Sequence, residues 1–387
     1  MSPMDTPLPS LALEAPAEAL PFPETHEPGI YFGLPEDEYH ADPSFSSSGI
    51  KQILVSNLTF WVNSWMNPNK PPQRESEALD RGKAYHKFIL EGEEAFNRCY
   101  AVAPDKGDYP GVLDTMAEMK AYAAKEGIGV KGTTKADIAA SIRKSDVTVP
   151  LWHEIVAEFE AERGEREEVS AELYAQLRLG KVVIANMPEV KNAFTDGRSE
   201  VSIFWRRMDG VPMKCRIDYL NRSIIDLKSF ANILDKEIRE AVAGEIARNR
   251  YQIQPAVYRD GVEAMKALYR QHGAAIVRKG DFDEGWLERV MTNRGTRFFF
   301  AFIRTGHVPD FIVREYGEFY ELGGNGMTPN EYWRRSRGCY AEGIRRYLEC
   351  MRFYGVEPDR PWLSDFGLRQ FTDQDFPLWF LQGKETE

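Results

Sequence analysis

Hydrophobic and polar residues follow two different periods along the chain. From Glu200 onward, apolar residues alternate with polar ones, which is the period of a half-buried strand. Turn signals at Asp209-Gly210 and at Asn221-Arg222-Ser223 separate three such runs, the last covering 224–228. This pattern predicts a three-stranded antiparallel meander in the middle of the chain.

Helical spacing dominates on both sides of the meander. Ser76 is placed to cap a helix over 76–91, on which Leu79, Gly82 and His86 share one face. The other expected elements are helices within 104–193 and at 233–247, 251–271 and 329–354, and strands at 297–303 and 310–316. This order predicts an α/β fold with a mixed sheet, flanking helices and a helical insertion.

The length of the chain fits one large domain with insertions or two domains, and we expect one large domain with short tails. The chain has 387 residues, of which 43% are hydrophobic, a normal share for a globular protein. Residues 1–28 are rich in Pro and Glu without apolar periodicity, so we expect a disordered tail there. The main domain is expected over 29–380, followed by a tail at 381–387.

Charge and cysteine usage narrow the class of protein. A net charge of −11 argues against a general nucleic-acid coat, although a nuclease needs only a local basic path. The sequence shows neither an apolar run long enough for a membrane helix nor a secretory signal. The four cysteines are scattered, so we expect reduced thiols in a cytoplasmic protein and no iron–sulfur cluster.

The meander carries the candidate chemistry. Asp226 and Lys228 are two residues apart on one strand, so both side chains leave the same face. Asp218 ends the preceding strand and can approach Asp226. Two carboxylates brought together repel unless a cation lies between them, and hard oxygen ligands suit Mg²⁺ or Mn²⁺. Alternatively, an Asp-x-Lys triplet on a strand is a surface charge pair.

Two helical motifs add candidates. Gly82 lacks a side chain and so allows a close approach near His86, although a lone histidine there is more often structural. Tyr251, Gln254 and Tyr258 share one helix face, which is either an aromatic packing stripe or part of a site.

These motifs, in this order, resemble a known family. Gly82-x-x-x-His86, Asp218, Asp226-Leu227-Lys228 and Tyr251-x-x-Gln254-x-x-x-Tyr258 are similar to the RecB-like branch of PD-(D/E)xK nucleases. The opening and the end resemble the RecE-type exonucleases of phage recombination systems, through Glu38-Tyr39-His40, Phe45-Ser46-Ser47-Ser48-Gly49-Ile50-Lys51, Val308-Pro309-Asp310-Phe311 and Pro377-Leu378-Trp379.

The resemblance implies a restriction-endonuclease-like PD-(D/E)xK core and assigns roles. It implies a metal held by His86, Asp218 and Asp226, with the Leu227 carbonyl as a further ligand, and Lys228 as the catalytic lysine. Gln254 and Tyr258 are carried over as catalytic candidates. Glu200 is a weaker candidate, because a glutamate at a strand end is usually solvated. Tyr251 is also a weaker candidate, because its helix face is equally well explained as an aromatic packing stripe.

The resemblance also implies an activity and its partners. RecE-like enzymes degrade linear double-stranded DNA from the 5′ end as ring-shaped homo-oligomers and pass single strands to an annealing protein. We therefore expect a metal-dependent 5′-to-3′ exonuclease. The alternatives are an endonuclease or flap nuclease with the same site, and a DNA-binding assembly protein with a relic nuclease fold.

Residues 111–144 depart from this family pattern. They read as helix, loop and helix, which is similar to SAP/LEM-type modules that often bind nucleic acid. Lys131, Lys135, Arg143 and Lys144 are candidates for phosphate contacts. A plain helical hairpin is the alternative.

Overall fold

The computed structural model describes residues 20, 22–72, 76–145, 148–188, 190, 193–321 and 327–363. The predicted tail at 381–387, the Pro377-Leu378-Trp379 motif and most of the predicted tail at 1–28 lie outside these ranges. Within the second half of that N-terminal segment, Phe22 packs against the main core, and the His26 ring stacks on Phe204 at 4.5 Å. Residues 22–28 are therefore part of the packed domain.

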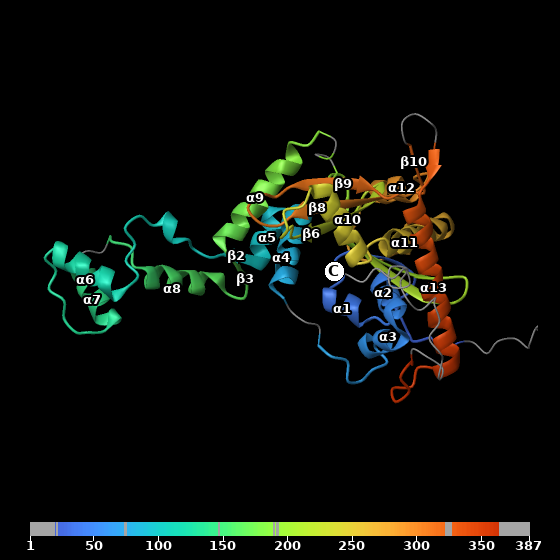
Figure 1. Ribbon diagram of the computed structural model, residues 1–387, viewed down its shortest axis with the longest axis horizontal. Coiled ribbons are helices and arrows are strands. Elements are labelled where there is room, and N and C mark those ends of the chain that lie inside the picture. Colours follow the sequence, from blue (N-terminus) through green and yellow to red (C-terminus); the bar gives the residue numbers. More distant parts are fainter. Residues whose placement is uncertain are drawn as a thin grey trace, which may run out of the picture.

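The centre of the fold is a mixed sheet of seven strands (Figure 1). In spatial order these are β7 (Val277–Lys279), β1 (Gly29–Tyr31), β4 (Arg198–Arg206), β5 (Pro212–Leu220), β6 (Ser223–Phe230), β8 (Arg297–Arg304) and β9 (Phe311–Glu315). The predicted antiparallel meander is β4–β5–β6, and β6 then pairs in parallel with β8. Because helices cover both faces of these central strands, β8 reads as an almost continuous apolar run.

Two hydrophobic cores lie on opposite faces of the central strands. The larger one contains Ile224 and Phe230 of β6, and the smaller one contains Ile225 and Leu227. The helices that supply the larger core are mainly α2 (Ser47–Val55), α11 (Ile253–His272), α12 (Glu284–Met291) and α13 (Glu331–Tyr354). Those of the smaller core are mainly α4 (Glu77–His86), the π-helix η1 (Lys87–Glu91), α5 (Glu93–Cys99) and α9 (Ala171–Ala185).

Shorter elements complete the body of the molecule. They are α1 (Glu36–Ala41), α3 (Asn57–Asn63), α10 (Ile238–Arg248), the 3-10 turns η2 (Lys106–Asp108) and η3 (Gly273–Ile276), and two small strand pairs, β2 (Tyr100–Val102) with β3 (Glu167–Val169) and β10 (Phe319–Glu321) with β11 (Met327–Pro329). Among the helices described, none is both long and apolar enough to cross a membrane.

Strands β5 and β6 pair only next to their connecting turn. Tyr219 pairs with Ile225 and Leu220 with Ile224, and beyond these residues the two strands separate. Strand β5 stays paired with β4 as far as Pro212, whereas β6 stays paired with β8 as far as Phe230. The separation opens the sheet next to Asp218 and Leu227, and this opening positions the site.

A helical module projects from one end of the molecule (Figure 1). It contains α6 (Met116–Lys125) and α7 (Lys135–Ser145), and α8 (Trp152–Arg163) connects it to the body. Its core is separate from the other two and extends from Leu113 to Leu151, which are joined by a β-bridge. The predicted limits of 111–144 therefore omit the last part of this core, because Val149 and Leu151 give no helical signal.

Candidate metal and catalytic site

The opening between β5 and β6 brings the predicted acidic pair and lysine together. The Lys228 ammonium lies 2.5 Å from Oδ2 of Asp226 and 3.8 Å from Oδ2 of Asp218. Asp226 is fully buried, and Asp218 is 9% exposed. Oδ2 of Asp218 also accepts a hydrogen bond from the Leu227 N–H at 2.8 Å. The surface-pair reading of the Asp-x-Lys triplet therefore does not describe this arrangement.

His86, the last residue of helix α4, lies at the same opening. Gly82, one turn earlier, lies so close to β6 that a Cβ there would come within 3.3 Å of Ser229 Oγ. The missing side chain thus lets α4 approach the strand, as expected from the sequence. Nδ1 of His86 lies 3.9 Å from Oδ2 of Asp218. The helix continues directly into the π-helix η1, an irregularity that is frequent at functional sites.

Glu200 completes a cluster that the sequence underrated. One ligand atom from each of His86, Glu200 and Asp218 lies within 4.8 Å of the other two. In the pairing of β4 with β5, Ser199 lies opposite Tyr219 and Val201 opposite Ile217, so Glu200 stands across from Asp218. Sequence patterning treats this position as a solvated strand end, because only the three-dimensional register reveals its neighbour.

The backbone at Glu200 is strained. Its φ of +52° lies in the left-handed region, which a side chain with a Cβ rarely adopts inside a strand. Such outliers cost about 1–3 kcal/mol and cluster at functional sites. This outlier turns one residue of β4 out of the regular strand geometry at the point where its carboxylate meets Asp218.

The carboxylates of the site repel each other in the absence of a cation. Burial raises the pKa of Glu200 to about 8, and the negative charge of Asp218 adds to the effect. Burial also raises the pKa of Asp226 to about 6, against the stabilising charge of Lys228. The pKa of Asp218 is raised for the same reason, burial. Lys228 alone does not compensate three carboxylates.

The pKa values of the two basic groups of the site, His86 and Lys228, are shifted in opposite directions. Burial lowers the pKa of His86 to about 4, and the charge of Lys228 lowers it further, so the imidazole is neutral at pH 7. Burial alone would also lower the pKa of Lys228, but Asp226 and Asp218 outweigh it and raise that pKa above its usual range. In the metal-free site Lys228 is therefore a cation at neutral pH, and His86 is a neutral nitrogen donor.

Helix α11 holds Asp226 from the opposite side. The Gln254 amide donates hydrogen bonds to Oδ1 of Asp226 and to the Tyr258 hydroxyl, both at 3.2 Å. The Tyr251 ring lies beneath the Lys228 ammonium, which is 5.3 Å from the ring centroid. The aromatic stripe is thus more than packing, because all three of its residues contact the site or its immediate partners.

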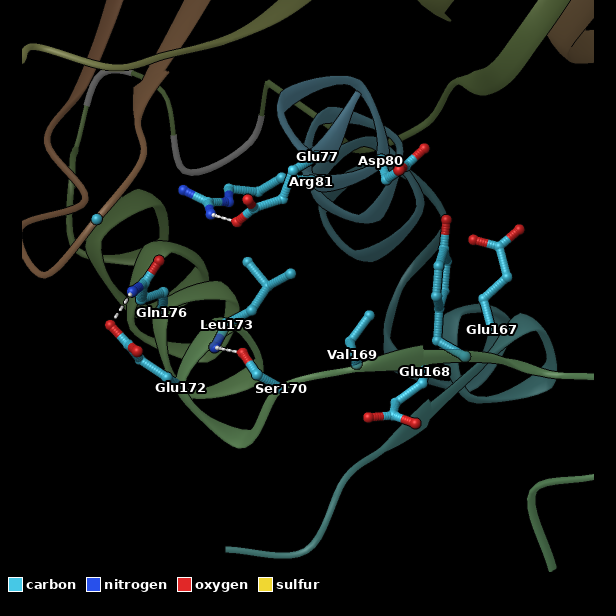
Figure 2. A pocket seen from close by; sticks show the side chains of 12 residues that line it. Glu77, Asp80, Arg81, Glu167, Glu168, Val169, Ser170, Glu172, Leu173 and Gln176 are labelled. Carbon is cyan, nitrogen blue, oxygen red and sulfur yellow. Dashed lines mark hydrogen bonds and ion pairs between the residues drawn. The ribbon is translucent and has the colours of Figure 1, made fainter. Parts of the chain in front are cut away.

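A separate cavity of about 400 Å³ lies between α4, β3 and α9 (Figure 2). Its lining includes the acidic side chains of Glu77, Asp80, Glu167, Glu168 and Glu172. Arg81 is paired with Glu77 there. None of the residues of the cluster lines this cavity. An anionic duplex would be repelled from it.

The donor set of the cluster fits a divalent cation. It offers one neutral imidazole nitrogen and carboxylate oxygens from Glu200 and Asp218, the hard ligands that Mg²⁺ and Mn²⁺ accept. Burial raises the pKa of both carboxyl groups and so disfavours their charged forms, which a bound dication would stabilise. The fit is thus supported by charge as well as by donor type.

Comparison with known proteins identifies the family of the chain. The family model described as a PDDEXK-like domain of unknown function (DUF3799) matches residues 46–279. Among solved structures, a protein from Eubacterium rectale provisionally named an exonuclease is 17% identical, with a TM-score of 0.38 over 90% of this chain and 96% of that chain. Comparison with curated proteins found no match. The family match spans more than half of the chain and includes the whole cluster. Together with the mixed sheet, it confirms the predicted restriction-endonuclease-like α/β fold, and the chain belongs to the PDDEXK-like family.

Proposed function

We propose that this protein is a metal-dependent deoxyribonuclease that digests linear double-stranded DNA as an exonuclease. The observation that carries the proposal is the meeting of the His86–Glu200–Asp218 cluster with the Asp226–Lys228 pair in the opening between β5 and β6. His86, Glu200 and Asp218 are the proposed metal ligands, together with Asp226 and the Leu227 carbonyl. Mg²⁺ or Mn²⁺ is the proposed ion. When bound, it polarises a phosphate and makes a water molecule more acidic.

Each of the other side chains of the site has a separate role in this proposal. In the metal-free site the Asp226 and Asp218 carboxylates raise the pKa of Lys228, and its ammonium is the group that would balance charge on the phosphate. Gln254 orients the Asp226 carboxylate through Oδ1. Tyr258 in turn receives the second hydrogen bond of the same amide, which fixes the rotamer of Gln254. His86 offers an unprotonated nitrogen.

The finer parts of the proposal rest on the sequence resemblance to RecE-type exonucleases. They are the 5′-to-3′ polarity, a homo-oligomeric assembly, a single-strand annealing partner and a role in phage-type recombination. The separate α6–α7 module supports a second DNA contact away from the opening, although Lys135 is paired with Asp114 and Arg143 with Glu154. Lys131 and Lys144 are then the candidates for phosphate contacts in that module.

One digestion separates this function from its alternatives. End-labelled linear duplex and covalently closed circular duplex are incubated with the protein and Mg²⁺ or Mn²⁺. An exonuclease degrades the linear substrate and spares the circle, whereas an endonuclease cuts both. A DNA-binding protein with a relic fold cuts neither, and that result would overturn the proposal.

A further inference from the structure

Lys51 lies at the edge of the site, next to Tyr251. It lies on α2, an otherwise uncharged helix that begins at the Ser46 cap. Its side chain is half-buried, and its ammonium lies 4.8 Å from the centroid of the Tyr251 ring. Within the described ranges, no carboxylate forms an ion pair with it and no acceptor forms a hydrogen bond with it. Among the described residues, the Tyr251 ring is therefore the contact of this ammonium, which is left able to pair with an anion.

The same tyrosine ring carries a second ammonium group. Lys228 lies 5.3 Å from the Tyr251 centroid, so two cations from α2 and β6 meet at one ring. Lys228 is paired with Asp226 at 2.5 Å, whereas no carboxylate of the described chain pairs with Lys51. Burial lowers the pKa of Lys51 to about 8, the charge of the neighbouring Lys228 ammonium adds to this shift, and the charge of Asp226 opposes it. An anion placed next to Lys51 would offset both effects.

We propose that Lys51 is a substrate-binding residue that pairs with a non-bridging oxygen of a phosphate in the bound DNA strand. The proposal rests on the nuclease function proposed above, and it adds a contact from an element outside the metal cluster. The opening between β5 and β6 presents carboxylates, which repel DNA. A cation that reaches the same opening from α2 attracts the DNA backbone and keeps it beside the cluster.

The unfolding temperature and the DNA affinity of a Lys51 variant together distinguish a role in folding from a role in substrate binding. If Lys51 served the fold, for instance as a balancing charge for the carboxylates, its removal would destabilise the protein. If it serves the substrate, its removal relieves an uncompensated half-buried charge, so Lys51→Gln keeps or raises the unfolding temperature while DNA binding weakens. Stability and binding therefore change in opposite directions.

The test measures duplex binding against salt concentration, with Ca²⁺ present and the recovered duplex checked for intactness. The variants are Lys51→Gln, the charge-retaining Lys51→Arg, and Lys181→Gln as a matched control. Lys181 also lies near an aromatic ring, 5.5 Å from that of Phe88, but it is exposed on α9. We expect Lys51→Gln to weaken binding about tenfold and to reduce the salt slope by roughly 0.9, the value for one duplex phosphate. Lys51→Arg and Lys181→Gln should keep the parental slope.

A second arm locates the phosphate. Duplexes carry one neutral methylphosphonate linkage, which is moved step by step along the strand. At one position the parental protein should lose affinity while Lys51→Gln loses none, because the charge pair is already gone. An unchanged salt slope in Lys51→Gln, or its failure to fold, would overturn the proposal. If the parental protein cuts no DNA but the slope still depends on Lys51, the nuclease function fails and the contact stands. If it cuts DNA and the slope is unchanged, only the role of Lys51 fails.

Discussion

The carboxylate of Asp218 accepts a hydrogen bond from the main-chain N–H of Leu227 at 2.8 Å, across the point where β5 and β6 separate. A side chain thus takes the place of the strand carbonyl that would normally accept this hydrogen bond. The bond fixes Asp218 relative to the residue between Asp226 and Lys228. The same group therefore has two tasks, since it holds the two strands in register and faces the proposed metal.

Glu200→Gln should stabilise the metal-free protein at alkaline pH. The folded protein holds the proton of Glu200 up to about pH 8, whereas an ordinary glutamate loses it near 4.5. Its contribution to stability is therefore complete below pH 4.5 and is lost as the pH rises towards 8. Glutamine has no charge to bury, so the unfolding temperature at pH 8.5 should rise by roughly 2 °C.

The same variant should bind Mn²⁺ about tenfold more weakly in calorimetry, because a charged ligand is removed. Thermal unfolding of both proteins between pH 4 and pH 9, with EDTA present, measures the first effect. Parallel stability curves together with parental Mn²⁺ affinity would remove Glu200 from the site.

His86→Ala should weaken Mn²⁺ binding by about tenfold or more. Because burial lowers the pKa of His86 to about 4, the contribution of this residue should persist at pH 5.5, where an ordinary histidine is mostly protonated. Isothermal titrations at pH 5.5 and pH 7.5 compare the two proteins. His307→Ala is the control, since its side chain is 88% exposed. Equal affinities for His86→Ala and the parent would exclude His86 as a ligand.

Removal of the α6–α7 module should leave the metal site working. The module has its own core, and its ends meet at the bridge between Leu113 and Leu151, so a short Gly-Ser link can replace 114–150. We expect parental cleavage of short duplexes and weaker binding of long DNA. Gel-shift titrations with duplexes of two lengths measure the second effect. Parental affinity for long DNA in the shortened protein would assign the module no role in DNA binding.

Most of the central sheet was predictable because its signals are local. Alternating residues and turn sequences located β4, β5 and β6, and the position of Ser76 located the start of α4, where its side chain accepts a hydrogen bond from the Leu79 N–H. The two short strands at one side of the sheet, β7 at its edge and β1 next to it, were missed. They are three residues each, too short for a periodic signal, and their pairing joins residues about 250 positions apart.

The site was predictable only in part, for a related reason. Asp226 and Lys228 share a strand face, which spacing reveals directly. The cluster of Glu200 with Asp218 depends on strand register and on one left-handed backbone position, neither of which the sequence encodes in a visible pattern. Lys51 gave one local signal, a single charge in an otherwise uncharged helix.

The rate of DNA cleavage by Asp226→Asn tests most directly whether the opening between β5 and β6 is a nuclease site. Asp218 also holds the backbone, whereas Asp226 contacts the site through its side chain alone, with Gln254 and Lys228 as partners. Asparagine keeps the shape and can still accept the hydrogen bond from Gln254. Asp283→Asn is the matched control, because Asp283 caps α12 and asparagine caps equally well.

Single-turnover digestion of a linear duplex in Mg²⁺ is the measurement, with the unfolding temperature recorded for each protein. We predict a loss of at least about 100-fold in rate for Asp226→Asn, with the fold retained, and the parental rate for Asp283→Asn. A well-folded Asp226→Asn protein that digests DNA at the parental rate would contradict the account.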